Sequence, residues 1–197
     1  MSNAECLVLG LLYEGLRYGH ELDRALDQRD MRKWTNISRV AIYQVLARMT
    51  ERGWVQAATE REGNMPQRTV YTMTPAGEEA LRRLVAEGLA SDGYVRFDYG
   101  VPLVYLDLLP PAVVIELLER RKTVARDMVE RMESRRDFAL QLFHRGADTP
   151  NPHHDPRLGP LANISHTLEF YRMEERWLDW LLDLLRAKTQ GDAENGS

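Results

Sequence analysis

One cluster in the sequence has the side chains of a metal site, namely His153, His154 and Asp155. Imidazole and carboxylate groups are common ligands of zinc, but two adjacent histidines on a loop rarely face the same ion. Further ligands would have to come from elsewhere in the chain, for example from His144 or His166. We therefore expect no metal and no other cofactor, and we interpret the cluster as part of a surface or effector-sensing loop.

A second group of side chains has the chemistry for contacting nucleic acid. Arg39 and Gln44 belong to types that bond guanine and adenine bidentately, and the hydroxyl of Tyr43 can contact a phosphate or a base edge. Arg61 and Arg68 flank a predicted hairpin, where long cations suit phosphates or the minor groove. The alternative is that the polar residues are solvated and that Tyr43 is a half-buried tyrosine that closes the domain.

The segment that would position the first three of these residues is a predicted helix over 38–52. Its apolar residues recur at i, i+3, i+4 and i+7, which is the spacing of a buried stripe. Ser38 is a plausible N-cap that can also touch a phosphate, and Gly53 ends the helix. The stripe consists of Ile42, Val45, Leu46 and Met49.

Further elements surround this helix. Residues 4–14 and 20–28 are helix-forming, and a polar connector ends near residue 34. One strand-like segment begins at residue 54 and a second covers 67–74, and a turn is expected between them at Gly63-Asn64. Thr74 and Pro75 then predict the cap and first residue of another helix. Three helices followed by a hairpin predict a winged helix-turn-helix domain over residues 1–90.

The second half of the chain is almost wholly helical in pattern. One helix is expected from Pro110-Pro111 to about residue 144, and another over 161–187, separated by a loop over 146–160. The last helix carries two neighbouring apolar stripes, which one antiparallel partner helix cannot bury. We therefore expect a mainly α protein with a small β-hairpin, a helical homodimerisation domain over 100–187 and a disordered tail over 188–197.

The overall charge, cysteine content and hydropathy of the chain permit these interpretations. Net charge is −4, but residues 1–75 hold ten Lys and Arg against nine Asp and Glu, and a DNA-binding domain needs only a local basic face. Cys6 is the single cysteine, so we expect no disulfide within the chain and a reducing, cytoplasmic location. No segment has the length and apolarity of a membrane span, and no catalytic pattern is evident, so we expect neither a membrane partner nor an enzyme.

The first 77 residues resemble the PadR family of bacterial transcriptional regulators. The resemblance rests on several motifs in their order: Tyr18-Gly19-His20-Glu21-Leu22, then Trp34, Ser38, Ile42-Tyr43, Leu46, Met49 and Gly53-Trp54-Val55, and then Arg68, Tyr71, Thr74 and Gly77. The helical second half is similar in length and character to the longer PadR subgroup. Two departures are that the family usually has His and Tyr where this chain has Tyr18 and His20, and Lys where it has Thr69.

The resemblance implies a sequence-specific regulator, expected to be a repressor that binds a pseudo-palindromic operator in double-stranded DNA as a homodimer. It also implies that a small aromatic compound could release the DNA. The alternative is a winged-helix protein-interaction adaptor without DNA binding. The candidate DNA-binding residues are Ser38, Arg39, Tyr43, Gln44, Arg61 and Arg68, and the candidate effector-binding residues are Tyr18, His20, His153, His154, Tyr171 and Trp177.

Overall fold

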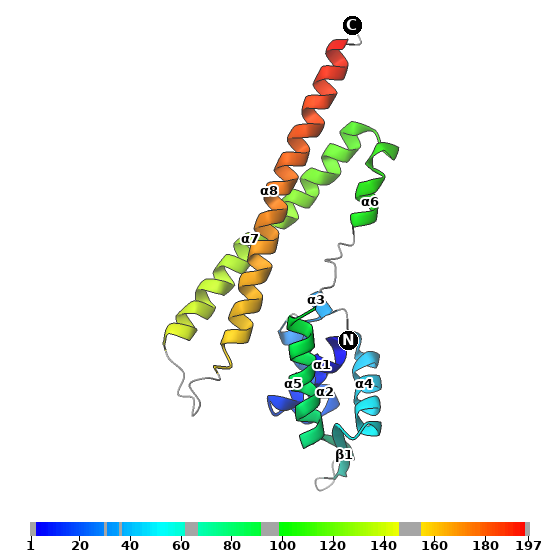
Figure 1. The fold of residues 1–197 in the computed structure, drawn as a ribbon, viewed down its shortest axis with the longest axis vertical. Coiled ribbons are helices and arrows are strands. Elements are labelled where there is room, and N and C mark those ends of the chain that lie inside the picture. The colour runs from blue at the N-terminus through cyan, green and yellow to red at the C-terminus, as the bar shows by residue number, and fades with distance from the viewer. Residues whose placement is uncertain are drawn as a thin grey trace. The chain divides into compact units, whose positions relative to one another are not determined.

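The computed structural model describes residues 3–29, 31–35, 37–61, 67–91, 99–145 and 155–195. The chain forms two compact units, residues 1–95 and 96–197 (Figure 1). The first unit contains α1 (Asn3–Tyr13), α2 (Gly19–Gln28), α3 (Arg32–Thr35), α4 (Arg39–Glu51), β1 (Val55–Glu60), β2 (Arg68–Met73) and α5 (Pro75–Leu89). The second contains α6 (Gly100–Val104), the 3₁₀-helix η1 (Leu106–Leu108), α7 (Pro111–His144) and α8 (Leu158–Asn195). This architecture confirms the predicted fold class.

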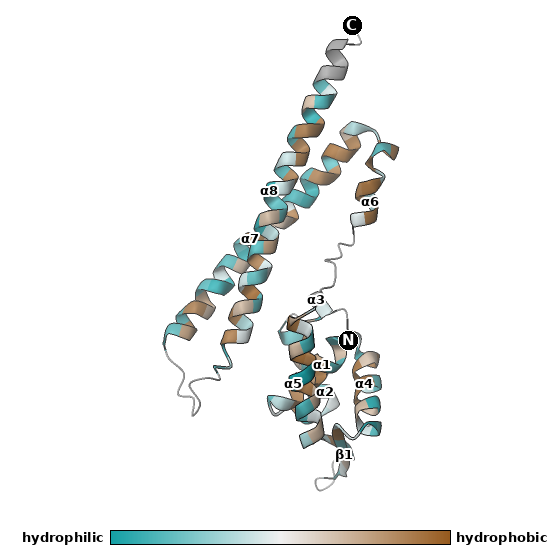
Figure 2. Ribbon diagram, viewed as in Figure 1, coloured by the Kyte–Doolittle hydropathy of each residue, from teal (hydrophilic) through white to brown (hydrophobic). Residues whose placement is uncertain are grey.

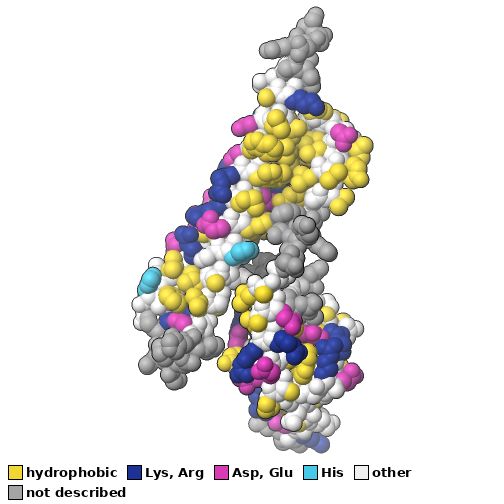
Figure 3. All heavy atoms as spheres, viewed as in Figure 1, with side chains coloured by type: hydrophobic (Ala, Val, Ile, Leu, Met, Phe, Trp, Pro, Cys, Tyr) yellow, Lys and Arg dark blue, Asp and Glu magenta, His cyan; other side chains and the backbone are white. Residues whose placement is uncertain are grey.

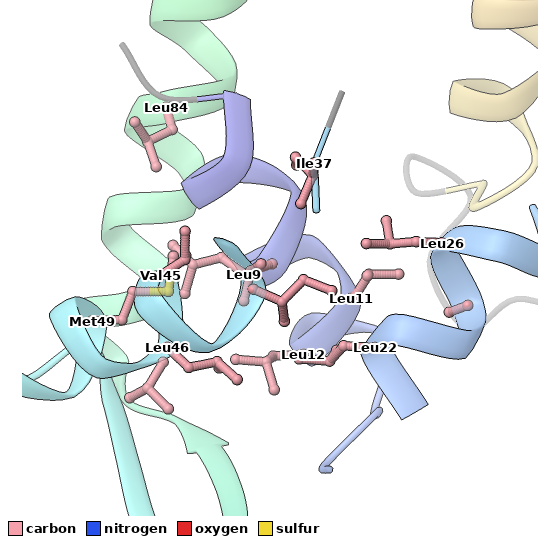
Figure 4. Close-up of a cluster of buried hydrophobic side chains, with 14 of the residues drawn as sticks. Leu9, Leu11, Leu12, Leu22, Leu26, Ile37, Val45, Leu46, Met49 and Leu84 are labelled. Atoms are coloured by element: carbon pink, nitrogen blue, oxygen red, sulfur yellow. The ribbon is translucent and has the colours of Figure 1, made fainter. Parts of the chain in front are cut away.

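The core of the N-terminal unit forms around α1, which packs against both α4 and α5. Leu9 of α1 and Leu46 of α4 are fully buried, and burial of one such side chain stabilises a fold by roughly 1.5–3 kcal/mol. Leu22 and Leu26 of α2 complete one side of this core. Figure 4 shows the α1 side chains between those of α4 and α2, with Leu84 of α5 nearby.

The bounds of α4 follow from its two ends. The Ser38 hydroxyl oxygen accepts a hydrogen bond from the Ala41 N–H at 3.1 Å, as expected of an N-cap. At the other end Gly53 has a φ of +71°, and the Trp54 N–H donates to the Met49 carbonyl at 2.9 Å. This is the Schellman arrangement, in which a glycine takes the left-handed conformation. Both predicted ends are therefore confirmed.

The hairpin is a two-stranded antiparallel sheet whose register runs from the pair Val55 and Met73 to the pair Glu60 and Arg68. The segment before α2 adds to it, because the Tyr71 N–H donates to the Arg17 carbonyl at 2.8 Å. The predicted turn at 63–64 lies outside the described residues. The wing is thus joined through backbone hydrogen bonding to the start of α2.

The C-terminal unit is built on the long antiparallel pair α7 and α8 (Figure 1). Val114, Leu118 and Ala125 of α7 are buried together with Leu178 and Leu182 of α8. Figure 2 shows apolar segments alternating with hydrophilic ones along both helices and a largely apolar α6. In the described residues, no helix is both long and apolar enough to cross a membrane.

The structure differs from the sequence expectations in four places. The connector after α2 contains the short helix α3, and α6 and η1 occupy a segment for which no element was predicted. α8 begins at Leu158, inside the predicted loop, since Pro160 falls in the first turn, where no backbone donor is needed. α8 also continues to Asn195, so the prediction of a disordered tail is wrong for 188–195; a helix already nucleated extends cheaply through residues such as Lys, Gln and Ala.

We expect Gly77→Ala to destabilise the N-terminal unit by about 1–3 kcal/mol, the usual cost of overpacking. A Cβ atom at this position would lie 2.1 Å from the Trp54 carbonyl oxygen and 2.9 Å from Met73 Cγ. The matched control is Gly10→Ala in α1, where a Cβ atom meets nothing within 4 Å and should stabilise by about 0.5–1 kcal/mol. Hydrogen exchange of the α1 amides measures both effects, and equal protection in the two variants would contradict the prediction.

Candidate nucleic-acid interface

One face of α4 is uncovered. The stripe Ile42, Val45, Leu46 and Met49 is buried, whereas the neighbouring positions along the helix are open to solvent. Val40 is 65% exposed and Tyr43 is 42% exposed, although both are apolar in large part. The exposed face consists of Arg39, Val40, Tyr43, Gln44, Ala47 and Arg48. α4 therefore presents a mixture of cationic, amide and apolar groups next to its capped N-terminus, as a helix that enters the major groove requires.

Beside this face lies a pocket of about 300 Å³ that joins α2, α4 and β2. We call it the tyrosine pocket, and its lining consists of Tyr18, Gly19, His20, Tyr43, Arg68, Thr69 and Tyr71. The rings of Tyr18 and His20 stack with their centroids 5.5 Å apart. Burial, and after it the nearby Tyr43, raises the pKa of Tyr71 above its ordinary value. Tyr71 is therefore a neutral hydrogen-bonding group at neutral pH.

Tyr43 is held in this pocket by a close approach to α2. A Cβ atom on Gly19 would lie 2.6 Å from Tyr43 Cε1, so any larger residue would require the ring to shift. Glu21 organises the same turn, because its carboxylate accepts from the Arg17 N–H at 3.0 Å and the Tyr18 N–H at 3.2 Å. The structure thus brings Tyr18 and His20, predicted as effector ligands, together with Tyr43 and Arg68, predicted as DNA ligands.

The other predicted DNA ligands lie on α4, at its N-cap and beside the hairpin. Gln44 is exposed on α4, and Ser38 is exposed at its cap. Arg39 lies at the first position of α4, with its Nε 3.0 Å from Asp23 Oδ2. Arg61 is exposed just after β1, and Arg68 opens β2 opposite Glu60. Most of these side chains therefore gather on the α4 and hairpin side of the N-terminal unit.

The remaining effector candidates do not share that site. Tyr171 and Trp177 lie on α8 in the C-terminal unit, half-buried against its apolar cluster. His153 and His154 lie outside the described residues. In the described part of the chain, no group of three or more His, Cys, Asp or Glu side chains is placed to hold a metal ion.

The C-terminal unit contains a buried ionic cluster that was not predicted from the sequence. The carboxylate of Glu174 is 1% exposed and accepts from Arg121 Nε at 2.8 Å and from Arg121 Nη2 at 2.9 Å. The hydroxyl of Tyr99 also donates to Glu174, and the Arg121 guanidinium lies 4.8 Å from the centre of the Tyr99 ring. Burial, and after it the Glu174 hydrogen bond, raises the pKa of Tyr99 to about 12. The cluster ties the start of the C-terminal unit to α7 and α8.

The C-terminal unit also exposes large apolar side chains. Figure 3 shows hydrophobic side chains gathered over the end of this unit that carries α6. Leu108 is 77% exposed, and Trp180 of α8 is 60% exposed. We group these two side chains with the exposed Val101, Val104, Tyr105, Leu109 and Leu184 as the apolar surface of the C-terminal unit. Large exposed apolar patches mark interaction sites, so we interpret this apolar surface as an interaction surface.

Comparisons with known proteins match both units. Residues 8–83 match the family described as Transcriptional regulator PadR-like family, and residues 96–186 match the family described as Virulence activator alpha C-term. No curated protein matches the chain.

Solved structures share the fold over nearly the whole chain. Bacillus subtilis PadR in complex with operator DNA is 17% identical with a TM-score of 0.74, and the match covers 94% of this chain and 98% of that one. The Vibrio cholerae virulence activator AphA is 18% identical with a TM-score of 0.67, covering 94% and 99%. Bacillus subtilis PadR in complex with p-coumaric acid is 15% identical with a TM-score of 0.68, covering 92% and 94%.

Proposed function

The chain belongs to the PadR-like family of transcriptional regulators, and from that premise we propose that it binds an operator in double-stranded DNA as a homodimer. The observation that carries this proposal is the uncovered face of α4, which lies beside the hairpin and the tyrosine pocket. Bacillus subtilis PadR, which shares the fold, has been solved with operator DNA. The protein would thus act in the cytoplasm, by binding rather than by catalysis.

In the proposed complex α4 lies in the major groove and the hairpin lies on the sugar–phosphate backbone. Gln44 and Arg39 would contact base edges, since N-terminal residues of such a helix lie deepest in the groove. Tyr43 and Arg68, which meet in the tyrosine pocket, would contact phosphates. Phosphate contacts position the domain on the duplex, and base contacts select the sequence.

The apolar surface of the C-terminal unit is proposed as the homodimer interface. Exposed side chains of α6, η1 and α8 contribute to it, so it extends beyond the last helix that the sequence indicated. A two-fold dimer presents two recognition helices to successive major grooves, which matches a pseudo-palindromic operator. Repression is the direct consequence if such an operator overlaps a promoter, because the bound dimer blocks polymerase.

A small aromatic effector completes the proposal. Bacillus subtilis PadR has also been solved with p-coumaric acid. In this chain Trp177 lies with its ring centre 6.5 Å from that of Tyr99, next to the Arg121–Glu174 ion pair. Aromatic faces beside a cation suit a planar aromatic acid. Tyr171 and Trp177 are therefore the described effector candidates in the C-terminal unit, while Tyr18 and His20 are those of the N-terminal unit.

The adaptor alternative is distinguished by salt dependence. A regulator that neutralises phosphates loses DNA affinity steeply as salt rises, whereas an adaptor has no such affinity.

We expect Gln44→Ala to lower affinity for a selected operator by about 1–3 kcal/mol, the scale of one bidentate base contact. Arg68→Ala should weaken binding to all sequences alike and reduce the salt slope by about one, as loss of one phosphate contact does. Fluorescence anisotropy with labelled duplexes measures both effects. Arg83→Ala is the matched control, since this exposed arginine lies on α5, away from the proposed interface. Wild-type affinity in the Gln44 and Arg68 variants would show that the DNA face has been misplaced.

For the dimer, Leu108→Glu and Leu184→Glu should each weaken self-association by tenfold or more. Each would place a charge in a surface where burial of one leucine contributes roughly 1.5–3 kcal/mol. Sedimentation equilibrium measures the dissociation constant. Leu89→Glu is the control, because Leu89 is 86% exposed but lies on α5 in the N-terminal unit. A wild-type protein that stays monomeric at micromolar concentration would disprove the dimer.

Phenolic acids should release operator DNA from the wild-type protein in a competition assay. Trp177→Leu should raise the concentration required by about tenfold, the effect of losing roughly 1.4 kcal/mol of stacking. Phe138→Leu should not, since Phe138 is an exposed aromatic residue of α7 that belongs neither to the proposed effector site nor to the apolar surface. His154→Ala tests the loop separately. Release at the same concentration from the wild-type and Trp177 proteins would exclude the α8 site.

A further inference from the structure

Asp23 of α2 lies between two arginines that belong to different elements. Its side chain is 15% exposed, Oδ1 forms an ion pair with Arg32 Nη2, and Oδ2 lies 3.0 Å from Arg39 Nε. Arg32 is the first residue of α3, and Arg39 is the first residue of α4. The Asp23 carboxylate therefore links α2 to both α3 and α4.

Arg32, the other arginine that contacts Asp23, fixes the position of the Asp23 carboxylate. Arg32 Nε donates to Asp27 Oδ1 at 2.6 Å, and Arg32 Nη1 donates to the Ile37 carbonyl. Arg32 is thus held by a second carboxylate and by the backbone just before α4. Since its guanidinium is planar and rigid, the oxygen of Asp23 that it does not use is presented toward Arg39.

The contact with Asp23 restricts how Arg39 can meet a base. The Arg39 side chain is 67% exposed, and Nε is the atom that lies close to Asp23. Guanine presents O6 and N7 on its major-groove edge, and arginine pairs with both acceptors through two N–H groups. With Nε 3.0 Å from a carboxylate oxygen, the two terminal Nη groups remain for an end-on contact.

We propose that Asp23 is a positioning residue that holds Arg39 for end-on contact with a guanine in each operator half-site. The inference rests on the proposed DNA binding. It adds a preference for guanine and names Asp23 as the residue that determines this preference. Asp23 does not touch DNA in this arrangement. Its charge repels phosphates, so it contributes to sequence selection and not to general affinity.

Because Asp23 is negatively charged, its loss should change base preference and general DNA affinity in different ways, which a purely structural role would not produce. Loss of Asp23 leaves Arg39 with more conformations and removes a negative charge from the interface. Preference for guanine at one operator position should fall, while affinity for unrelated duplex DNA should stay equal or rise. A variant that is merely unfolded would lose both.

The experiment uses the full-length protein and begins with selection of bound duplexes from a random pool. Binding constants are then measured on duplexes that change one operator position at a time. Asp23→Ala and Arg39→Ala should each reduce the preference for guanine at the same position by about tenfold, and the double variant should lose no more than Arg39→Ala. Glu14→Ala is the matched control, since it removes the carboxylate that pairs with Arg29 in the same unit and leaves Asp23, Asp27, Arg32 and Arg39 in place.

Three outcomes overturn the proposal. One is an Asp23→Ala variant with wild-type base preferences. Another is an equal loss of affinity at every operator position, both in Asp23→Ala and in Asp23→Asn, which keeps the shape of the side chain. The third is a Glu14→Ala variant that loses the same guanine preference. A wild-type protein that selects no sequence overturns the proposed DNA binding, and this inference with it.

Discussion

Burial of one stripe of α4 against α1 is the constraint on which the candidate interface depends. Ile42, Leu46 and Met49 have no exposed surface, and a helix has only one rotation that buries all three. A rotation by one residue, about 100°, would place the phenol of Tyr43 in the core and bring Ile42 to the surface. The apolar packing of α4 therefore decides which polar side chains face outward, although none of those side chains takes part in it.

A second set of contacts converts that outward face into a site. Pairing of the Arg17 and Tyr18 backbone with β2 brings the start of α2 beside the hairpin, and the absence of a side chain at Gly19 admits the Tyr43 ring. α4 is thereby joined to α2 and the hairpin through one aromatic side chain. The helix proposed to enter the groove and the hairpin proposed to contact the DNA backbone are thereby connected, which is what a binder of fixed register requires.

Local patterns predicted the parts of the fold whose causes are local. Ser38 and Gly53 mark the ends of α4 because capping depends on residues within one turn, and the period of its apolar residues marks its buried face. The Asp23–Arg39 pair and the Glu174 cluster were not predictable in this way. Tyr99, Arg121 and Glu174 are spread over 75 residues of sequence, and only the packing of α7 on α8 brings them together. The tyrosine pocket was missed for the same reason, although four of its members had been singled out separately.

Affinity and sequence preference would have different structural origins in this protein. A two-fold operator requires two recognition helices about 34 Å apart, so affinity depends on how a dimer holds its N-terminal units. The ion pairs that join Arg32, Asp23 and Arg39 lie wholly within one N-terminal unit, so the proposed base preference would not depend on that spacing. An effector acts only through its differential affinity for the DNA-bound and released forms. An effector bound to the C-terminal unit would consequently scale the affinity for all operator variants together and leave the ranking of bases at each position unchanged.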